Sequence, residues 1–140
     1  MHIVLDASAA VEFLVGTATG VTAARILIVA ESVHAPDLIV PETLSVLRSL
    51  VLREEISSDR AAAAARDLHD LTLEVWPSMP LADSAWTLRG QFTVYDAMYV
   101  ALARALDQAT LLTCDRRLAR GVRTATDIDV IDLGHDDRAE

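Results

Sequence analysis

Four acidic residues stand where the chain is expected to leave a strand or enter a helix, and they are the residues best suited to chemistry. They are Asp6, Glu42, Asp96 and Asp115. Carboxylates gathered in one place repel one another, so either their pKa values rise or a divalent cation holds them together. Because all the ligands would be oxygen atoms, such a site suits Mg²⁺ or Mn²⁺. The four acids therefore predict a metal-binding site, provided that the fold brings them together.

Each of these acids also has an ordinary structural interpretation. Acidic side chains stabilise helix N-termini, where free N–H groups and the helix dipole favour negative charge. Asp6 and Asp115 could cap the helices that follow them, and Glu42 could simply occupy a first helical turn. Thr93 and Asp96 have nearly the spacing and composition of a capping box. For any single acid this interpretation is the simpler one, but the same placement at four points favours a shared site.

The elements that must position these acids alternate along the chain. The expected strands are residues 3–5, 33–35, 73–76, 110–113 and 128–133. The expected helices are residues 7–14, 21–31, 42–53, 58–71, 81–89, 93–106 and 115–120, with a helix-breaking loop at 16–20. This alternation predicts one α/β domain over residues 1–140, with a parallel sheet and helices on both faces. Asp6 and Asp115 both follow strands, so we expect them at the same edge of that sheet.

Composition excludes several other functions. The chain has 12 Lys+Arg against 21 Asp+Glu, a net charge of −9, which argues against passive binding of nucleic acid. Every basic residue is Arg, so a P-loop, a Schiff-base enzyme and phosphatases that use a Lys beside the phosphate are disfavoured. One cysteine excludes a disulfide framework. No signal peptide or membrane-length apolar run is present, so we expect a cytoplasmic protein without a membrane segment.

The run Ile26 to Ala30 is apolar on nearly every side of its expected helix. One apolar stripe is enough to attach a helix to a core. The surplus favours a second buried face, against a partner or another subunit; the alternative is simple burial at the centre of the domain.

Four short motifs, spread over nearly the whole chain in order and spacing, resemble PIN-domain ribonucleases, and most closely VapC toxins of bacterial toxin–antitoxin pairs. The motifs are Ile-Val-Leu-Asp6-Ala-Ser8, Pro41-Glu42-x-x-Ser-Val-Leu, Tyr95-Asp96-Ala-x-Tyr99-Val-Ala-Leu-Ala and Leu-Leu-Thr113-Cys-Asp115-x-x-Leu118. The resemblance implies a three-layer α/β/α PIN-like fold with a central parallel sheet. It also implies that Asp6, Glu42, Asp96 and Asp115 are the catalytic, metal-binding residues, with Mg²⁺ or Mn²⁺ as cofactor.

The same resemblance implies the partners. Such proteins are the toxins of type II toxin–antitoxin pairs, which cleave RNA and are silenced by a VapB-type antitoxin. They form homodimers, and heterotetramers or larger assemblies with the antitoxin.

The expected mechanism is metal-assisted hydrolysis of an RNA phosphodiester bond by an activated water. Asp6 and Asp96 are the expected direct ligands, with Glu42 and Asp115 completing the site directly or through water. Four further residues have weaker expected roles. Ser8 and Thr113 would orient the carboxylates, unless they are ordinary turn and strand-end hydroxyls. Arg116 and Arg117 would contact phosphate, unless they only form a solvated helix face.

Two alternatives remain open from the sequence. In the first, the protein is a non-catalytic acidic interaction module, in which the acids only stabilise helices and the apolar run is the functional surface. In the second, the metal site acts on another phosphate ester, as a DNA nuclease or a phosphatase. The first alternative predicts no dependence on divalent metal, and the second is distinguished by substrate.

Overall fold

The computed structural model describes residues 1–134, within which five strands form one parallel sheet. The strands are β1 (His2–Leu5), β2 (Ser32–Pro36), β3 (Glu74–Trp76), β4 (Ala109–Thr113) and β5 (Asp129–Asp132). Their order across the sheet is β3-β2-β1-β4-β5, and every neighbouring pair is parallel. The predicted parallel sheet is confirmed.

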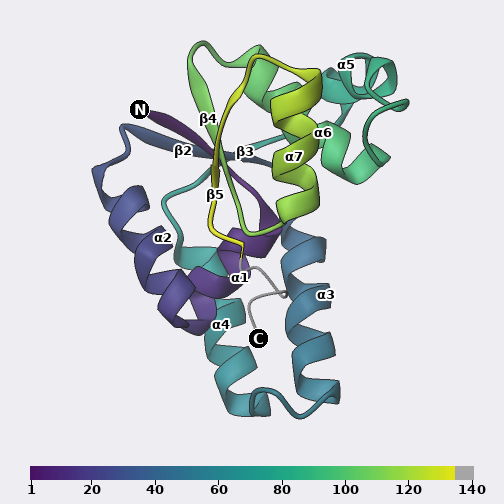
Figure 1. The fold of residues 1–140 in the computed structure, drawn as a ribbon. Helices are drawn as coiled ribbons and strands as arrows, with labels where there is room; N and C mark the ends of the chain where they lie inside the picture. The colour runs from purple at the N-terminus through teal and green to yellow at the C-terminus, as the bar shows by residue number, and fades with distance from the viewer. Residues whose placement is uncertain (135–140) are drawn as a thin grey trace.

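Helices cover both faces of this sheet. They are α1 (Ala7–Val15), α2 (Ala18–Val29), α3 (Ile39–Leu52), α4 (Ser58–Asp70), α5 (Ala82–Thr87), α6 (Val94–Ala105) and α7 (Arg116–Ala125), with a 3₁₀ turn at Met79–Leu81. The chain crosses the sheet in one direction from β1 to β3 and in the other from β3 to β5. Because parallel crossovers are right-handed, the helices on the two sides of the sheet belong to the two directions of crossing. Helices α1 and α2 lie on one face, with the α3–α4 pair packed against α1, and α5–α7 lie on the other (Figure 1). The predicted three-layer α/β/α architecture is therefore confirmed.

The chain reverses its direction across the sheet between β1 and β4. In open α/β sheets, the connections leave opposite faces at such a point, and a crevice opens at the carboxyl ends of the two strands. Leu5 is paired in register with Leu112, and the Asp6 N–H donates to the Leu112 carbonyl at 3.0 Å. Asp6, the first residue after β1, therefore stands beside Thr113, the last residue of β4.

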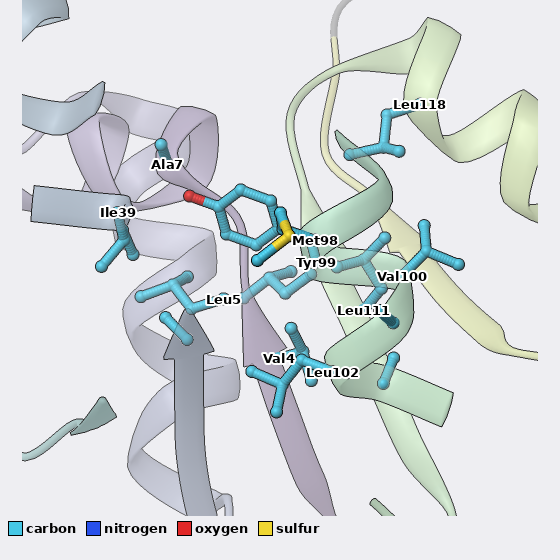
Figure 2. Close-up of a cluster of buried hydrophobic side chains, with 14 of the residues drawn as sticks. Val4, Leu5, Ala7, Ile39, Met98, Tyr99, Val100, Leu102, Leu111 and Leu118 are labelled. Atoms are coloured by element: carbon cyan, nitrogen blue, oxygen red, sulfur yellow. The ribbon is translucent and has the colours of Figure 1, made fainter. Parts of the chain in front are cut away.

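The core that supports this edge is mostly aliphatic and is centred on α6, which packs against β1, β2 and β4. Figure 2 shows Leu102 of α6 beside Val4 of β1, with Leu111 of β4 also in the cluster. The side chains of Val4, Leu102 and Leu111 are fully buried. Strands covered on both faces are buried along their length, as residues 3–5 and 109–113 are, and residues 3–5 form the unbroken apolar run typical of such strands.

Three predicted helix boundaries are wrong by three residues or more: α3 begins at Ile39 rather than at residue 42, and the other two errors involve glycine. Helix α2 begins at Ala18, so Gly20 is helical rather than part of a breaker loop; the Thr17 side chain caps the helix by accepting from the Gly20 N–H at 3.0 Å. Helix α7 continues past Gly121 to Ala125, and the Phe92 ring packs where a larger side chain would stand at residue 121. Close packing, rather than a turn, explains glycine at both positions.

The apolar face of α2 is not buried at the centre of the domain. Ile28 and Val29 are 84% and 71% exposed, whereas Ile26 and Leu27 are partly buried against the core. Central burial is therefore wrong for the outer half of the predicted apolar run. No single helix in residues 1–134 is long and apolar enough to cross a membrane; α1 and α2 reach that length and composition only as a pair, bent by 107°.

Candidate active site: an acidic pocket at the carboxyl edge of the sheet

The four predicted acids line one pocket, with a volume of about 300 Å³, at the carboxyl edge of the sheet. Asp6 lies at the junction of β1 and α1, and Asp115 is the residue before α7. Glu42 and Asp96 come from the first turns of α3 and α6. The remaining lining residues are Ala7, Ser8, Ser45 and Val46. Four elements far apart in sequence thus bring their acids to the crevice between β1 and β4.

The Asp6 carboxylate is buried and is held by side-chain hydroxyls. Its Oδ2 accepts hydrogen bonds from Ser8 Oγ at 2.5 Å and Thr113 Oγ1 at 2.7 Å. Asp6 occupies the N-cap position of α1 but makes no capping hydrogen bond there. The Ser8 N–H also lowers the pKa of Asp6, but less than the hydroxyls of Ser8 and Thr113 do. The capping interpretation is therefore wrong for Asp6.

The capping interpretation does describe Asp115. Its Oδ1 accepts from the N–H groups of Arg117 and Leu118 at 2.9 and 3.1 Å, which caps α7. The Asp115 N–H in turn donates to Thr113 Oγ1 at 2.9 Å. Thr113 therefore connects two of the acids, because its hydroxyl donates to Asp6 and accepts from the backbone of Asp115.

Asp96 and Glu42 are positioned by their own helices and by one tyrosine. Thr93 caps α6 by accepting from the Asp96 N–H at 3.3 Å, which places Asp96 in the first turn as the sequence predicts. Glu42 Oε1 accepts a hydrogen bond from the Tyr99 hydroxyl at 2.8 Å. In the sequence, Tyr99 belongs to the third motif, which predicts no role for it. Its position three residues after Asp96 was a usable signal, because residues i and i+3 share one face of a helix.

Burial and mutual repulsion make this pocket unfavourable for negative charge. The pKa values of Asp6, Glu42 and Asp96 are all raised, in each case mainly by burial. Neighbouring carboxylates add to the effect: Asp115 raises the pKa of Asp6, and Asp6 raises the pKa values of Glu42 and Asp96. Among residues 1–134, no salt bridge joins an Arg or a His to any of the four acids.

The two arginines after Asp115 lie in different surroundings. Both are exposed on α7. Arg117 is close enough to Asp96 for its charge to lower the pKa of that carboxyl slightly. The alkyl chain of Arg116 instead packs at Gly134, just after β5. Arg117 is therefore near one acid of the pocket.

The raised pKa values predict how stability depends on pH when no divalent cation is present. When the pH lies between the unfolded and folded pKa values of one of these carboxyls, that carboxyl binds more protons in the folded state than in the unfolded state. The free energy of unfolding must therefore fall as pH rises through the folded pKa values, with a slope of up to about 1.4 kcal/mol per pH unit for each proton released. Urea unfolding in EDTA from pH 4, near the ordinary pKa values of these carboxyls, to pH 8 measures this dependence. A free energy that stays constant or rises over this range would contradict the assignment.

The carboxylates are not arranged as a closed cage of ligands. Within residues 1–134, no group of three or more His, Cys, Asp or Glu side chains is already placed to hold one metal ion directly. The donor set nevertheless fits a hard divalent cation, because it consists of carboxylate oxygens in a pocket that disfavours unpaired negative charge. Mg²⁺ usually retains several waters, so one or two carboxylates in direct contact are sufficient.

Residues 3–123 match the family model of the PIN domain, and the chain belongs to this family. It is 39% identical over 129 residues to Ribonuclease VapC12 from Mycobacterium tuberculosis, covering 92% of this chain and 98% of that protein. It is 43% identical over 117 residues to Ribonuclease VapC1 from the same species, covering 83% and 87%. The fold is similar to VapBC2 from Rickettsia felis, solved bound to a DNA fragment from their promoter, with TM-score 0.65, 13% identity and coverage of 94% and 98%.

Proposed function

We propose that this protein is a metal-dependent endoribonuclease and the toxin of a type II toxin–antitoxin pair. The observation that carries the proposal is the shared pocket of Asp6, Glu42, Asp96 and Asp115. It occurs in a chain that is 39% and 43% identical to two ribonucleases of the VapC group. The reaction proposed is hydrolysis of an RNA phosphodiester bond by water.

The four acids would hold the cation, Mg²⁺ or Mn²⁺. Asp6 and Asp96 are the proposed direct ligands, with Glu42 and Asp115 completing the site directly or through water. When bound, the cation lowers the pKa of a coordinated water and offsets negative charge on the phosphodiester as the bond breaks. The hydrogen bonds of Asp6 support its role as a direct ligand. Its Oδ2 accepts from Ser8 and Thr113, so Oδ1 is left to bind the cation.

The other proposed roles concern orientation and substrate binding. Ser8 and Thr113 keep the Asp6 carboxylate in one orientation, which is how hydrogen-bonded neighbours tune metal ligands. Arg117, with Arg116 beside it, binds phosphate groups of the RNA at the rim. Attack by an external water does not require the RNA 2′-hydroxyl, so selection of RNA comes from binding and shape.

A VapB-type antitoxin is the proposed regulating partner, as the VapBC name of the Rickettsia felis structure suggests for that pair. We propose that the chain is a single PIN domain that acts in the cytoplasm as a homodimer, and as a heterotetramer or larger assembly with its antitoxin. The exposed apolar residues of α2, Ile28 and Val29, support the presence of a protein partner.

The test is cleavage of total RNA by the purified, antitoxin-free protein with Mg²⁺ or Mn²⁺, with EDTA, and with metal restored. We expect cleavage that is lost in EDTA and recovered on adding metal. Asp96→Asn is expected to lower the rate at least about 100-fold, because it removes a negative ligand without changing side-chain size. Asp107→Asn is the control, since Asp107 is an exposed acid that precedes β4, at the other edge of the sheet.

Three outcomes would contradict the proposal in different ways. Cleavage that persists equally in EDTA or in Asp96→Asn would exclude this metal site as its source. Metal-dependent hydrolysis of DNA or of phosphate monoesters, without RNA cleavage, would support the alternative of another phosphate ester. Well-folded protein with no metal-dependent activity on any of these substrates would favour the non-catalytic interaction module.

A further inference from the structure

We propose that Tyr99 is a positioning residue for the acidic pocket, because its hydroxyl holds the Glu42 carboxylate beside the start of α1. This inference rests on the proposed function, since it concerns how that site is assembled. It adds a fifth side chain to the four acids, and this side chain contacts neither substrate nor cation.

The Tyr99 side chain is completely buried, with 0% exposure, in the core beneath the pocket. Its hydroxyl donates to Glu42 Oε1 at 2.8 Å, over a separation of 57 residues in sequence. Figure 2 shows the ring beside Met98 and the hydroxyl oxygen directed toward Ala7, the first residue of α1. The Ala7 N–H is close enough to that oxygen to lower the pKa of the phenol. The hydroxyl thus lies between Glu42 and the residue that follows Asp6.

This placement joins the elements that carry three of the acids. Tyr99 follows Asp96 by one turn on α6, Glu42 is on α3, and Ala7 adjoins Asp6 at the start of α1. The ring is fixed by the packed core, so the hydroxyl is a rigid reference point for the carboxylate. A Glu side chain has several rotatable bonds and would otherwise sample several rotamers in a half-open pocket. With Glu42 Oε1 fixed by Tyr99, Oε2 is the oxygen left to bind a cation.

The hydroxyl is also a permanent donor. A phenol is protonated at neutral pH, so the Tyr99 hydroxyl has a proton to donate to Glu42. A buried hydroxyl needs a hydrogen-bond partner, and a backbone carbonyl would satisfy that need equally well. Here the acceptor is a pocket carboxylate, and a hydrogen bond to a charged acceptor is stronger and more directional than one between neutral groups. The tyrosine therefore does more than fill the core.

The test compares Tyr99→Phe with the wild type in calorimetric titration with Mn²⁺ and in RNA cleavage. The variant retains the ring and loses only the hydroxyl. We expect Mn²⁺ to bind about 10-fold more weakly and cleavage to slow by about 10-fold, within the range observed when neighbours of metal ligands are altered. Tyr95→Phe is the matched control, because Tyr95 is on the same helix but 66% exposed; it should leave Mn²⁺ affinity unchanged.

A second comparison separates positioning from a purely structural role. In a Glu42→Ala background, Tyr99→Phe should cause no further loss of Mn²⁺ affinity, because the carboxylate that it positions is absent. If Tyr99→Phe does not fold, Glu42→Asp tests the same link, since the shorter side chain keeps the charge but cannot keep the hydrogen bond. It should then show the same 10-fold weakening.

Wild-type affinity in Tyr99→Phe would overturn the inference while leaving the proposed function intact. The inference is also overturned if Tyr99→Phe lowers Mn²⁺ affinity equally in the wild-type and Glu42→Ala backgrounds. If Tyr99→Phe does not fold, wild-type Mn²⁺ affinity in Glu42→Asp overturns it. A wild-type protein that neither binds Mn²⁺ nor cleaves RNA would overturn the proposed function, and the inference with it.

Discussion

Replacing Asp6 with asparagine is expected to abolish RNA cleavage and, at the same time, to stabilise the metal-free protein. The loss of activity should be about 1000-fold or more, because electrostatic stabilisation of the reacting groups is the largest contribution that such a site makes. The gain in stability follows from burial, which together with the neighbouring Asp115 raises the pKa of Asp6. At pH 7 an amide avoids that unfavourable charge.

Asparagine preserves the local hydrogen bonds, which makes the comparison clean. Its side-chain oxygen can accept from Ser8 and Thr113 as Asp6 Oδ2 does. We expect the melting temperature in EDTA at pH 7 to rise by roughly 3 °C, the shift that corresponds to about 1 kcal/mol in a domain of this size. Added Mg²⁺ should stabilise the wild type but not the variant, because ligand binding stabilises only the state that binds it.

Asp129→Asn is the control for both measurements, since Asp129 is exposed at the amino end of β5, on the opposite edge of the sheet. It should change neither cleavage nor the response to Mg²⁺. An Asp6→Asn variant that cleaves RNA normally would remove Asp6 from the proposed site. A variant that is less stable than the wild type in EDTA would show that the buried carboxylate is favourable as it stands.

Replacing Gly20 with alanine is expected to destabilise the fold by about 3 kcal/mol or more, the upper end for forcing extra volume into a packed interior. A β-carbon at residue 20 would lie 1.9 Å from the carbonyl oxygen of Glu12 and 3.0 Å from the Cα of Phe13. Both are backbone atoms of α1, so no side-chain rotation relieves the clash. The two helices must separate, which exposes the core contacts between them.

Urea unfolding of Gly20→Ala and of the control Gly90→Ala measures this effect. No atom lies within 4 Å of a β-carbon built at Gly90, so that substitution should be neutral or stabilising by up to about 1 kcal/mol. Equal stabilities for the two variants would mean that α1 and α2 are not packed as closely as described. Because α1 begins beside Asp6, a destabilised Gly20→Ala protein should also lose RNA cleavage.

Local patterns in the sequence were sufficient to predict the architecture. The apolar run at residues 3–5 specifies a strand buried on both faces, because such strands dispense with polar alternation. Thr93 specifies the start of α6 through a hydrogen bond to a residue three positions away. Strands that alternate with helices then require a parallel sheet. The placement of acids directly after strands followed from the same short-range information.

The helix boundaries at glycine could not be predicted in this way. Gly20 and Gly121 suggest helix breaks in the sequence, yet both are helical. Glycine is needed at both positions because a neighbouring element leaves no room for a β-carbon. The neighbour is Glu12 on α1 in one case and the Phe92 ring in the other. Which residues approach so closely depends on the packing of whole helices, and no local pattern specifies it.

For this protein, the sequence by itself determined which residues carry charge to the edge of the sheet, since strand and helix ends are set by interactions within a few residues. Only the tertiary structure decided what those charges contact. Asp6 is held by Thr113, 107 residues away, as well as by Ser8 of its own helix, and Glu42 is held by Tyr99, 57 residues away. These hydrogen bonds and the raised pKa values depend on burial and on distances through space, which exist only once the layers have packed.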